Sequence, residues 1–232
     1  MPQRTVLLWC CVPLVCAAGC VGGPFSEYAH WRPDLRKEWK QDEAFGPTYH
    51  QQVNDLRHLG RNAARMTPAE QQQWSEHLSA MAANEENSAL QIEVIRALAS
   101  FPTASTAAAL RNATTSGDAG VRMAAAVAWG RLGGSEAVEQ LAALVGSDTD
   151  PDVRLAATRE LGRFSDAAAI RALGIALDDD SPALQYRAMQ SLRLATGRNY
   201  GNSVPTWRIF VQGGDPGPER TPSVTERVRR LF

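Results

Sequence analysis

The sequence predicts an all-α protein in which antiparallel helix pairs stack one after another. Three observations support this fold class: apolar residues recur at helical spacing, the pattern repeats every 31 or 32 residues, and capping residues mark the helix boundaries. The composition suits a folded chain, since 44% of the 232 residues are hydrophobic and 21% are charged. The chain is therefore expected to bury an apolar core between its helices.

Positive and negative charges are nearly balanced. The 24 Lys and Arg residues are matched by 25 Asp and Glu residues, which gives a formal net charge of −1. Nucleic-acid binding depends largely on a basic excess that neutralises phosphates. We therefore expect no nucleic-acid partner.

Residues 1–19 are predicted to be an export signal. Arg4 is followed by thirteen residues, Val6 to Ala18, without a charged side chain. Thirteen helical residues reach about 20 Å, short of the roughly 30 Å hydrocarbon core, so a permanent membrane span is disfavoured.

The signal ends on small residues followed by Cys20. This ending resembles the lipobox of bacterial lipoproteins, which implies acylation of Cys20 and a lipid anchor on the periplasmic side of a membrane. The match departs at Ala17, where such boxes usually carry leucine. The alternative is cleavage by an ordinary signal peptidase, which would release a secreted or periplasmic protein.

The cysteines all lie in the first 20 residues, at Cys10, Cys11, Cys16 and Cys20. The chain beyond Cys20 therefore cannot form an internal disulfide. We expect this part to fold by packing alone, without a metal ion or cofactor.

Residues 20–47 are predicted to be a tether, because Pro and Gly breaks alternate there with charged residues. Residues 48–87 predict a diverged N-terminal helical pair. Its second helix begins at a capping box formed by Thr67 and Glu70 and continues with an apolar stripe.

Residues 88–197 contain the repeat of 31 or 32 residues. One apolar series is Leu90, Val121, Val153 and Leu184, and a second follows eight positions later at Leu98, Trp129, Leu161 and Leu192. The second series is expected to fill one recurring core position. A third series, Ala107, Val138 and Ile170, predicts the second helix of each unit.

Helix boundaries agree with this period. Asp150-Pro151 and Ser181-Pro182 each place a capping oxygen before a proline, which is typical of a helix start. Gly133, Gly146 and Gly197 are expected to end helices in left-handed caps.

Arginine recurs in register at Arg122 and Arg154, each four residues after an aspartate, Asp118 or Asp150. We expect these i,i+4 pairs to form a structural ladder between stacked units. The nearby aspartates at residues 148–152 are predicted to favour helix N-termini rather than to bind calcium.

The segments 118–125 and 150–157 share the pattern Asp-x-x-Val-Arg-x-Ala-Ala. Followed by a glycine and a second helix, this pattern resembles HEAT-like repeats of the short bacterial kind, also found in phycobilin lyases. The resemblance covers residues 88–197 and implies a right-handed α-solenoid that binds partners. Because such repeats serve many functions, it indicates the fold more strongly than the activity.

Residues 198–232 are predicted to be a capping segment with a flexible tail. Trp207 lies beyond the last repeat and is expected to cover the open end of the stack. The alternative is that Trp207 stacks on a ligand.

No recognisable catalytic motif accompanies the repeats. For example, no histidine is followed by glutamate, as iron enzymes related to deoxyhypusine hydroxylase would require. We therefore expect a non-enzymatic, membrane-tethered scaffold that binds another protein in the cell envelope. The alternative is a lyase- or chaperone-like subunit that handles a bound cofactor or client, by analogy with phycobilin lyases.

Lipidation of Cys20 gives the first testable prediction. Two acyl chains on one cysteine supply the two signals that stable anchoring needs. Metabolic labelling with palmitate should therefore mark the wild type and leave the Cys20→Ser variant unlabelled. Equal label in both proteins, or label in neither, would contradict the lipoprotein interpretation.

Overall fold

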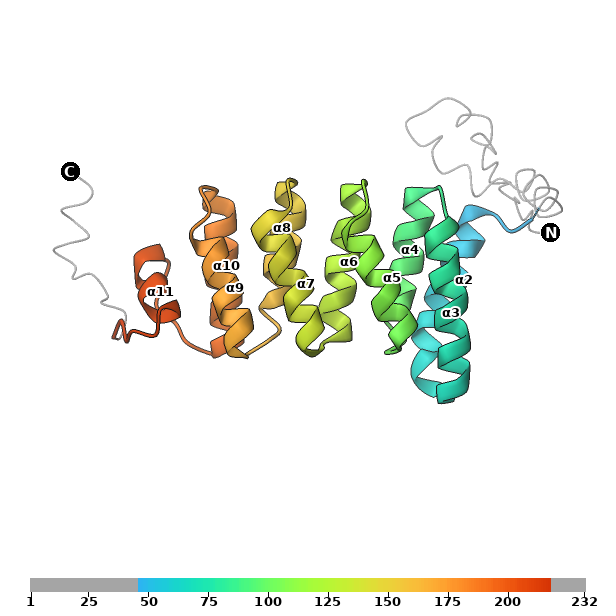
Figure 1. The fold of residues 1–232 in the computed structure, drawn as a ribbon, viewed down its shortest axis with the longest axis horizontal. Coiled ribbons are helices and arrows are strands. Elements are labelled where there is room, and N and C mark those ends of the chain that lie inside the picture. Colours follow the sequence, from blue (N-terminus) through green and yellow to red (C-terminus); the bar gives the residue numbers. More distant parts are fainter. Residues whose placement is uncertain (1–45, 218–232) are drawn as a thin grey trace, which may run out of the picture. The chain divides into compact units, whose positions relative to one another are not determined.

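The computed structural model describes residues 46–217 of the chain, and these residues form helices without strands. All of the helices belong to the unit Tyr49–Phe232. Within this unit, helix pairs follow one another in chain order (Figure 1). The all-α solenoid predicted from the sequence is thereby confirmed.

Each pair consists of a first helix and a second helix. The first helices are α2 (Tyr49–Asn62), α4 (Ser88–Leu98), α6 (Ala119–Leu132), α8 (Pro151–Leu161) and α10 (Pro182–Thr196). The second helices are α3 (Pro68–Asn84), α5 (Ala104–Thr114), α7 (Gly134–Ser147), α9 (Ala167–Leu177) and α11 (Val204–Val211). A 3₁₀ turn, η3 (Ala63–Arg65), joins α2 to α3.

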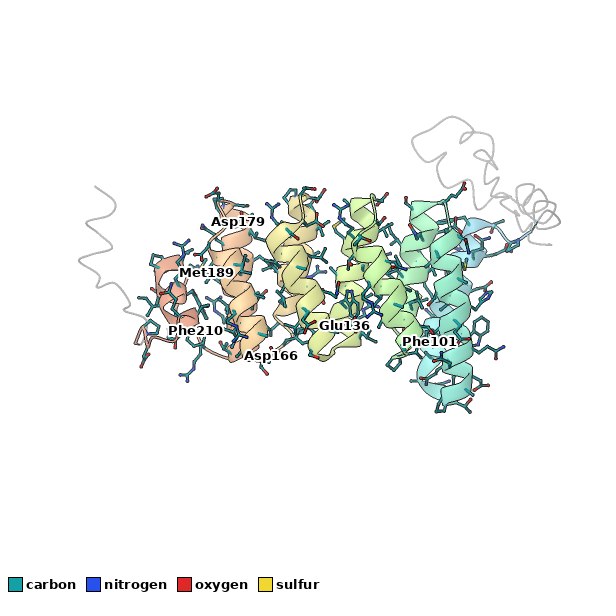
Figure 2. All side chains as sticks on the ribbon, viewed as in Figure 1. Phe101, Glu136, Asp166, Asp179, Met189 and Phe210 are labelled. Carbon is teal, nitrogen blue, oxygen red and sulfur yellow. The ribbon has the colours of Figure 1, made fainter. Side chains whose placement is uncertain are left out.

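The helices lie in two layers. In the first-helix layer, each of α2, α4, α6, α8 and α10 contacts the next one in this order. In the second-helix layer, α3, α5, α7, α9 and α11 do the same. Loops between pairs and loops within pairs lie at opposite edges, as Asp179 and Asp166 show (Figure 2).

Local capping explains where the helices begin. Asp118 and Asp150 cap α6 and α8 through hydrogen bonds from backbone N–H groups of the first turn. Thr67 and Glu70 form the predicted capping box. Gly197 ends α10 with a left-handed φ of 68°. The predicted cap at Gly146 is wrong, because α7 continues through it to Ser147.

The last pair has a shorter second helix than the others. Helix α11 spans 8 residues and contacts both α9 and α10. The sequence predicts a capping segment here, and the structure shows that Val204–Val211 of this segment is helical. Pro205 near its start suits a helix N-terminus, where a backbone N–H is not needed.

The repeated apolar series forms the core. The side chains of Leu98, Leu161 and Leu192 are fully buried, and Trp129 is 1% exposed. The earlier series of Leu90, Val121, Val153 and Leu184 is buried as well. The 31- or 32-residue period therefore places one residue of each unit at an equivalent core position.

Successive first helices approach closely at two glycines. A Cβ atom on Gly130 would lie 2.5 Å from Oε2 of Glu160, and one on Gly162 would lie 2.9 Å from the Cα atom of Ser191. Both glycines lie at the C-terminal end of a first helix and face the following one. The missing side chains thus allow the layer to pack tightly.

Several predictions concern residues outside the described part of the chain. Cys20, the export signal and nearly all of the tether precede residue 46, and the predicted flexible tail falls mainly after residue 217. Among the described residues, none of the helices combines the length and apolar character needed to cross a bilayer.

Core packing generates the second prediction. Leu161→Ala removes a fully buried side chain whose unit is stacked on both sides, and it should lower the free energy of unfolding by about 2–5 kcal/mol. Leu194→Ala makes the same chemical change at a side chain that is 72% exposed, and it should cost no more than about 0.5 kcal/mol. Urea denaturation of both variants measures the two effects. Equal destabilisation would disprove the assignment of Leu161 to the core.

Candidate functional site

Arg122 links two successive helix pairs. Its Nε and Nη2 donate to the two carboxylate oxygens of Asp148, at 2.8 and 2.9 Å. Its Nη1 donates to the carbonyl oxygen of Ser116 at 2.8 Å. The guanidinium therefore joins the loop before α6 to the loop before α8.

The next unit repeats this arrangement with a weaker ion pair. Nη1 of Arg154 donates to the carbonyl oxygen of Asp148 at 3.0 Å, and Nε lies 3.6 Å from Oδ2 of Asp179. In the last unit Gln185 takes the same place and donates to the carbonyl oxygen of Asp179 at 2.7 Å. These contacts form a ladder along the edge that carries the loops between pairs.

The ladder differs from the predicted one in its acidic partners. Arg122 pairs with Asp148, 26 residues ahead, and not with Asp118. Arg154 likewise pairs with Asp179 and not with Asp150. Asp118 and Asp150 accept backbone N–H groups as helix caps, so their carboxylates are already engaged. The prediction of i,i+4 partners is therefore wrong, although both arginines do connect stacked units.

The Asp148 carboxylate is ionised, although its contact with Arg122 is largely shielded from solvent. Burial would raise its pKa, but hydrogen bonds from Arg122 and from the backbone N–H of Asp150 outweigh burial and lower the pKa below its usual range. The same hydrogen bond raises the pKa of Arg122. Folding thus favours the charged forms of both partners.

Trp207 is enclosed at the C-terminal end of the stack. It is 0% exposed, and its indole Nε1 donates to the carbonyl oxygen of Gly201 at 2.9 Å. Its ring packs edge-on against Tyr200 and Phe210, with centroids 5.1 and 5.9 Å away. This placement fits a capping residue and leaves no ring face for the alternative, stacking on a ligand.

A groove of about 610 Å³ lies on the first-helix layer. It is lined by α4, α6, α8 and α10, and it combines half-buried apolar side chains with arginines. The apolar lining includes Ile92, Met123, Val127 and Leu155. The charged lining consists of Arg96, Arg131, Arg159, Arg187 and Asp152. We call this surface the arginine groove.

The arginine groove continues toward the first helix pair. A neighbouring pocket of about 340 Å³ shares Arg96 and Arg131 with it and adds Arg57 and Arg61 from α2. One basic surface thus extends across the whole first-helix layer.

Two buried glutamates neutralise some of these arginines. Glu93 accepts from both Arg57 and Arg96. Glu160 pairs with Arg159 at 3.0 Å and lies 3.6 Å from Arg163. Within residues 46–217, Arg131 and Arg187 have no ion-pair partner. Their charges are therefore available to a ligand.

The sequence contains a signal for this groove that is separate from the core positions. Two positions after the first core series, an apolar side chain recurs at Ile92, Met123, Leu155 and Tyr186. Ile92, Met123 and Leu155 pack partly against the core, and the rest of their apolar surface lines the groove. Searching for in-register apolar residues on the solvent side of the repeat would have identified the groove.

Comparison with known proteins agrees with the geometry. The family model for HEAT repeats matches residues 75–158, from α3 into α8. Over these residues the chain resembles HEAT repeat proteins. Among curated proteins, none matches it.

HEAT-like repeat proteins generally mediate contacts between proteins, since stacked pairs present an extended surface to a partner. In the part of the chain that the structure describes, no group of three His, Cys, Asp or Glu side chains is placed to hold a metal ion.

The ladder generates the third prediction. Asp148→Asn replaces a charge-assisted contact by a neutral one and should lower the free energy of unfolding by about 1–3 kcal/mol at neutral pH. The lowered pKa of Asp148 means that its contribution is present above the unfolded-state pKa of about 3.9 and is lost as pH falls through the folded-state pKa. The difference in the free energy of unfolding between the wild type and Asp148→Asn should therefore become smaller in acid.

Urea denaturation at neutral pH and at about pH 3 measures this effect. Asp180→Asn is the matched control, because Asp180 is exposed and forms no ion pair within the described residues. Two results would contradict the assigned role of Asp148. One is that Asp148→Asn lowers the free energy of unfolding no more than Asp180→Asn does, and the other is that its effect is the same at neutral and acidic pH.

Proposed function

We propose that this protein is a membrane-tethered, non-enzymatic scaffold that binds another protein of the cell envelope through the arginine groove. The observation that carries the proposal is the groove itself. Four first helices contribute to it, and apolar side chains remain half-buried there instead of fully packed. Apolar residues rimmed by polar ones are typical of protein-binding surfaces.

The composition of the groove also suits a protein partner. Arginine and methionine are both enriched in protein interfaces, and arginine combines an apolar stem with a planar donor group. Arg96, Arg131 and Arg159 are exposed, and Met123 lies among them on α6. A partner that covered the groove would bury apolar area and satisfy guanidinium donors together.

The membrane tether in this proposal rests on the sequence of the first 20 residues. An acylated Cys20 would hold the protein at a membrane surface and so raise its effective concentration near partners at the same surface. A secreted or periplasmic form, the alternative product of cleavage, would bind through the same groove.

The lyase- or chaperone-like alternative makes a different claim about the bound molecule. It requires a cofactor or client that stays with the purified protein. The scaffold proposal requires only a protein in contact with the groove. Mass spectrometry of the bound species therefore separates the two functions.

Site-specific photo-crosslinking in native membranes tests the proposal. A photoreactive amino acid in place of Asp152, which is exposed in the arginine groove, should give a crosslinked protein. The same amino acid in place of Glu139, which is exposed on α7 in the second-helix layer, should not.

Both positions carry an exposed acidic side chain, so the two variants differ mainly in the surface they probe. Equal crosslinking from the two positions, or crosslinking from Glu139 alone, would refute binding through the groove. A small-molecule adduct at Asp152 without a protein adduct would favour the alternative function.

A further inference from the structure

We infer that the arginine groove binds an acidic amphipathic helix of the partner, laid across α6, α8 and α10. This inference rests on the proposed function and specifies the chemistry of the partner. Apolar side chains of the helix would contact the apolar row of the groove, and its carboxylates would pair with Arg131 and Arg187. Three features of the groove carry the argument.

The first feature is the positive charge in the groove that no acidic side chain neutralises. Its lining contains four arginines and a single aspartate, Asp152. Buried Glu93 and Glu160 engage Arg96 and Arg159, whereas Arg131 and Arg187 have no acidic partner in the described residues. An uncompensated pair of guanidinium groups beside an apolar surface favours a ligand with carboxylates.

The second feature is the apolar row, which lies across the helices rather than along one of them. Met123 on α6, Leu155 on α8 and Tyr186 on α10 hold equivalent places in successive units. Met123 and Leu155 line the groove and are half-buried, whereas Tyr186 lies beside the lining residue Arg187 in the sequence and is 50% exposed. The row therefore offers one apolar contact for each helix that it crosses.

The third feature is the match in spacing between this row and a helix. Packed helices are about 8–10 Å apart, and seven residues of an α-helix rise about 10.5 Å. A helix laid across the layer would present one apolar residue of each heptad to each successive unit. Glutamates beside that stripe would then face the arginines of the groove.

A lipid surface or a nucleic acid fits the same observations less well. Both present dense phosphate charge, and buried acids engage half of the groove's arginines. Neither ligand supplies apolar groups at the distance that separates neighbouring packed helices. The apolar row would be left uncovered by a phosphate backbone, whereas an amphipathic helix covers it.

The test uses the full-length protein in detergent and three fluorescein-labelled peptides of three heptads. All three carry leucine at positions a and d, and they carry Glu, Gln or Lys at positions e and g. Fluorescence anisotropy should show that the Glu peptide binds at least about tenfold more tightly than the Gln and Lys peptides. Its affinity should fall as salt is raised, because exposed ion pairs are screened.

Charge reversal locates the binding site. The double variant Arg131→Glu/Arg187→Glu should weaken binding of the Glu peptide at least about tenfold. Arg171→Glu is the matched control, since Arg171 is exposed on α9 in the second-helix layer, and it should bind as the wild type does. Circular dichroism checks that all variants retain their helices.

Three outcomes would overturn the inference. These are equal binding of the three peptides, unchanged binding by the double variant, and binding of phosphatidylglycerol vesicles or a single-stranded oligonucleotide without binding of the Glu peptide. If the peptide fails while crosslinking from Asp152 still captures a protein, the scaffold function stands and the acidic helix is wrong. If the peptide binds but no protein crosslinks in native membranes, the scaffold function fails instead.

Discussion

The fold depends on the contact between each first helix and the next one. No pair can bury its apolar face alone, because Leu161 and its equivalents need the neighbouring unit to exclude water. Gly130 and Gly162 bring neighbouring first helices close enough for this exclusion, and Arg122 and Arg154 connect the loops at one edge. Stability is thus built from short-range contacts that repeat along the chain, and each unit affects chiefly its neighbours.

The same stacking produces the candidate binding surface. Equivalent residues of successive units lie side by side. A residue type that recurs at one position of the repeat therefore forms a continuous stripe on the surface. Arg96 and Arg159 hold equivalent places two units apart, and Val127 holds the place between them. Neither the apolar row nor the arginines form a surface within one helix; the surface exists only in the stack.

The sequence predicted the core better than it predicted the contacts of charged side chains. Apolar periodicity identifies Leu98 and its equivalents because burial of a helix face is a local property. The acidic partner of Arg122 was missed because Asp148 is 26 residues away and is brought close only by stacking. The i,i+4 rule describes an isolated helix, where Asp118 would be free. The groove was missed for a similar reason, since its parts come from four separate helices.

The aromatic cluster at the C-terminal end bears on how copies of the protein meet. Stacked units end in a face that resembles the faces buried inside, and such a face could accept a unit from another chain and start head-to-tail growth. This face is filled by the side chains of Trp207, Tyr200 and Phe210. The ring of Trp207 packs against the other two rings, and its indole N–H donates to a backbone carbonyl group. The cluster therefore acts against fibre formation through this end.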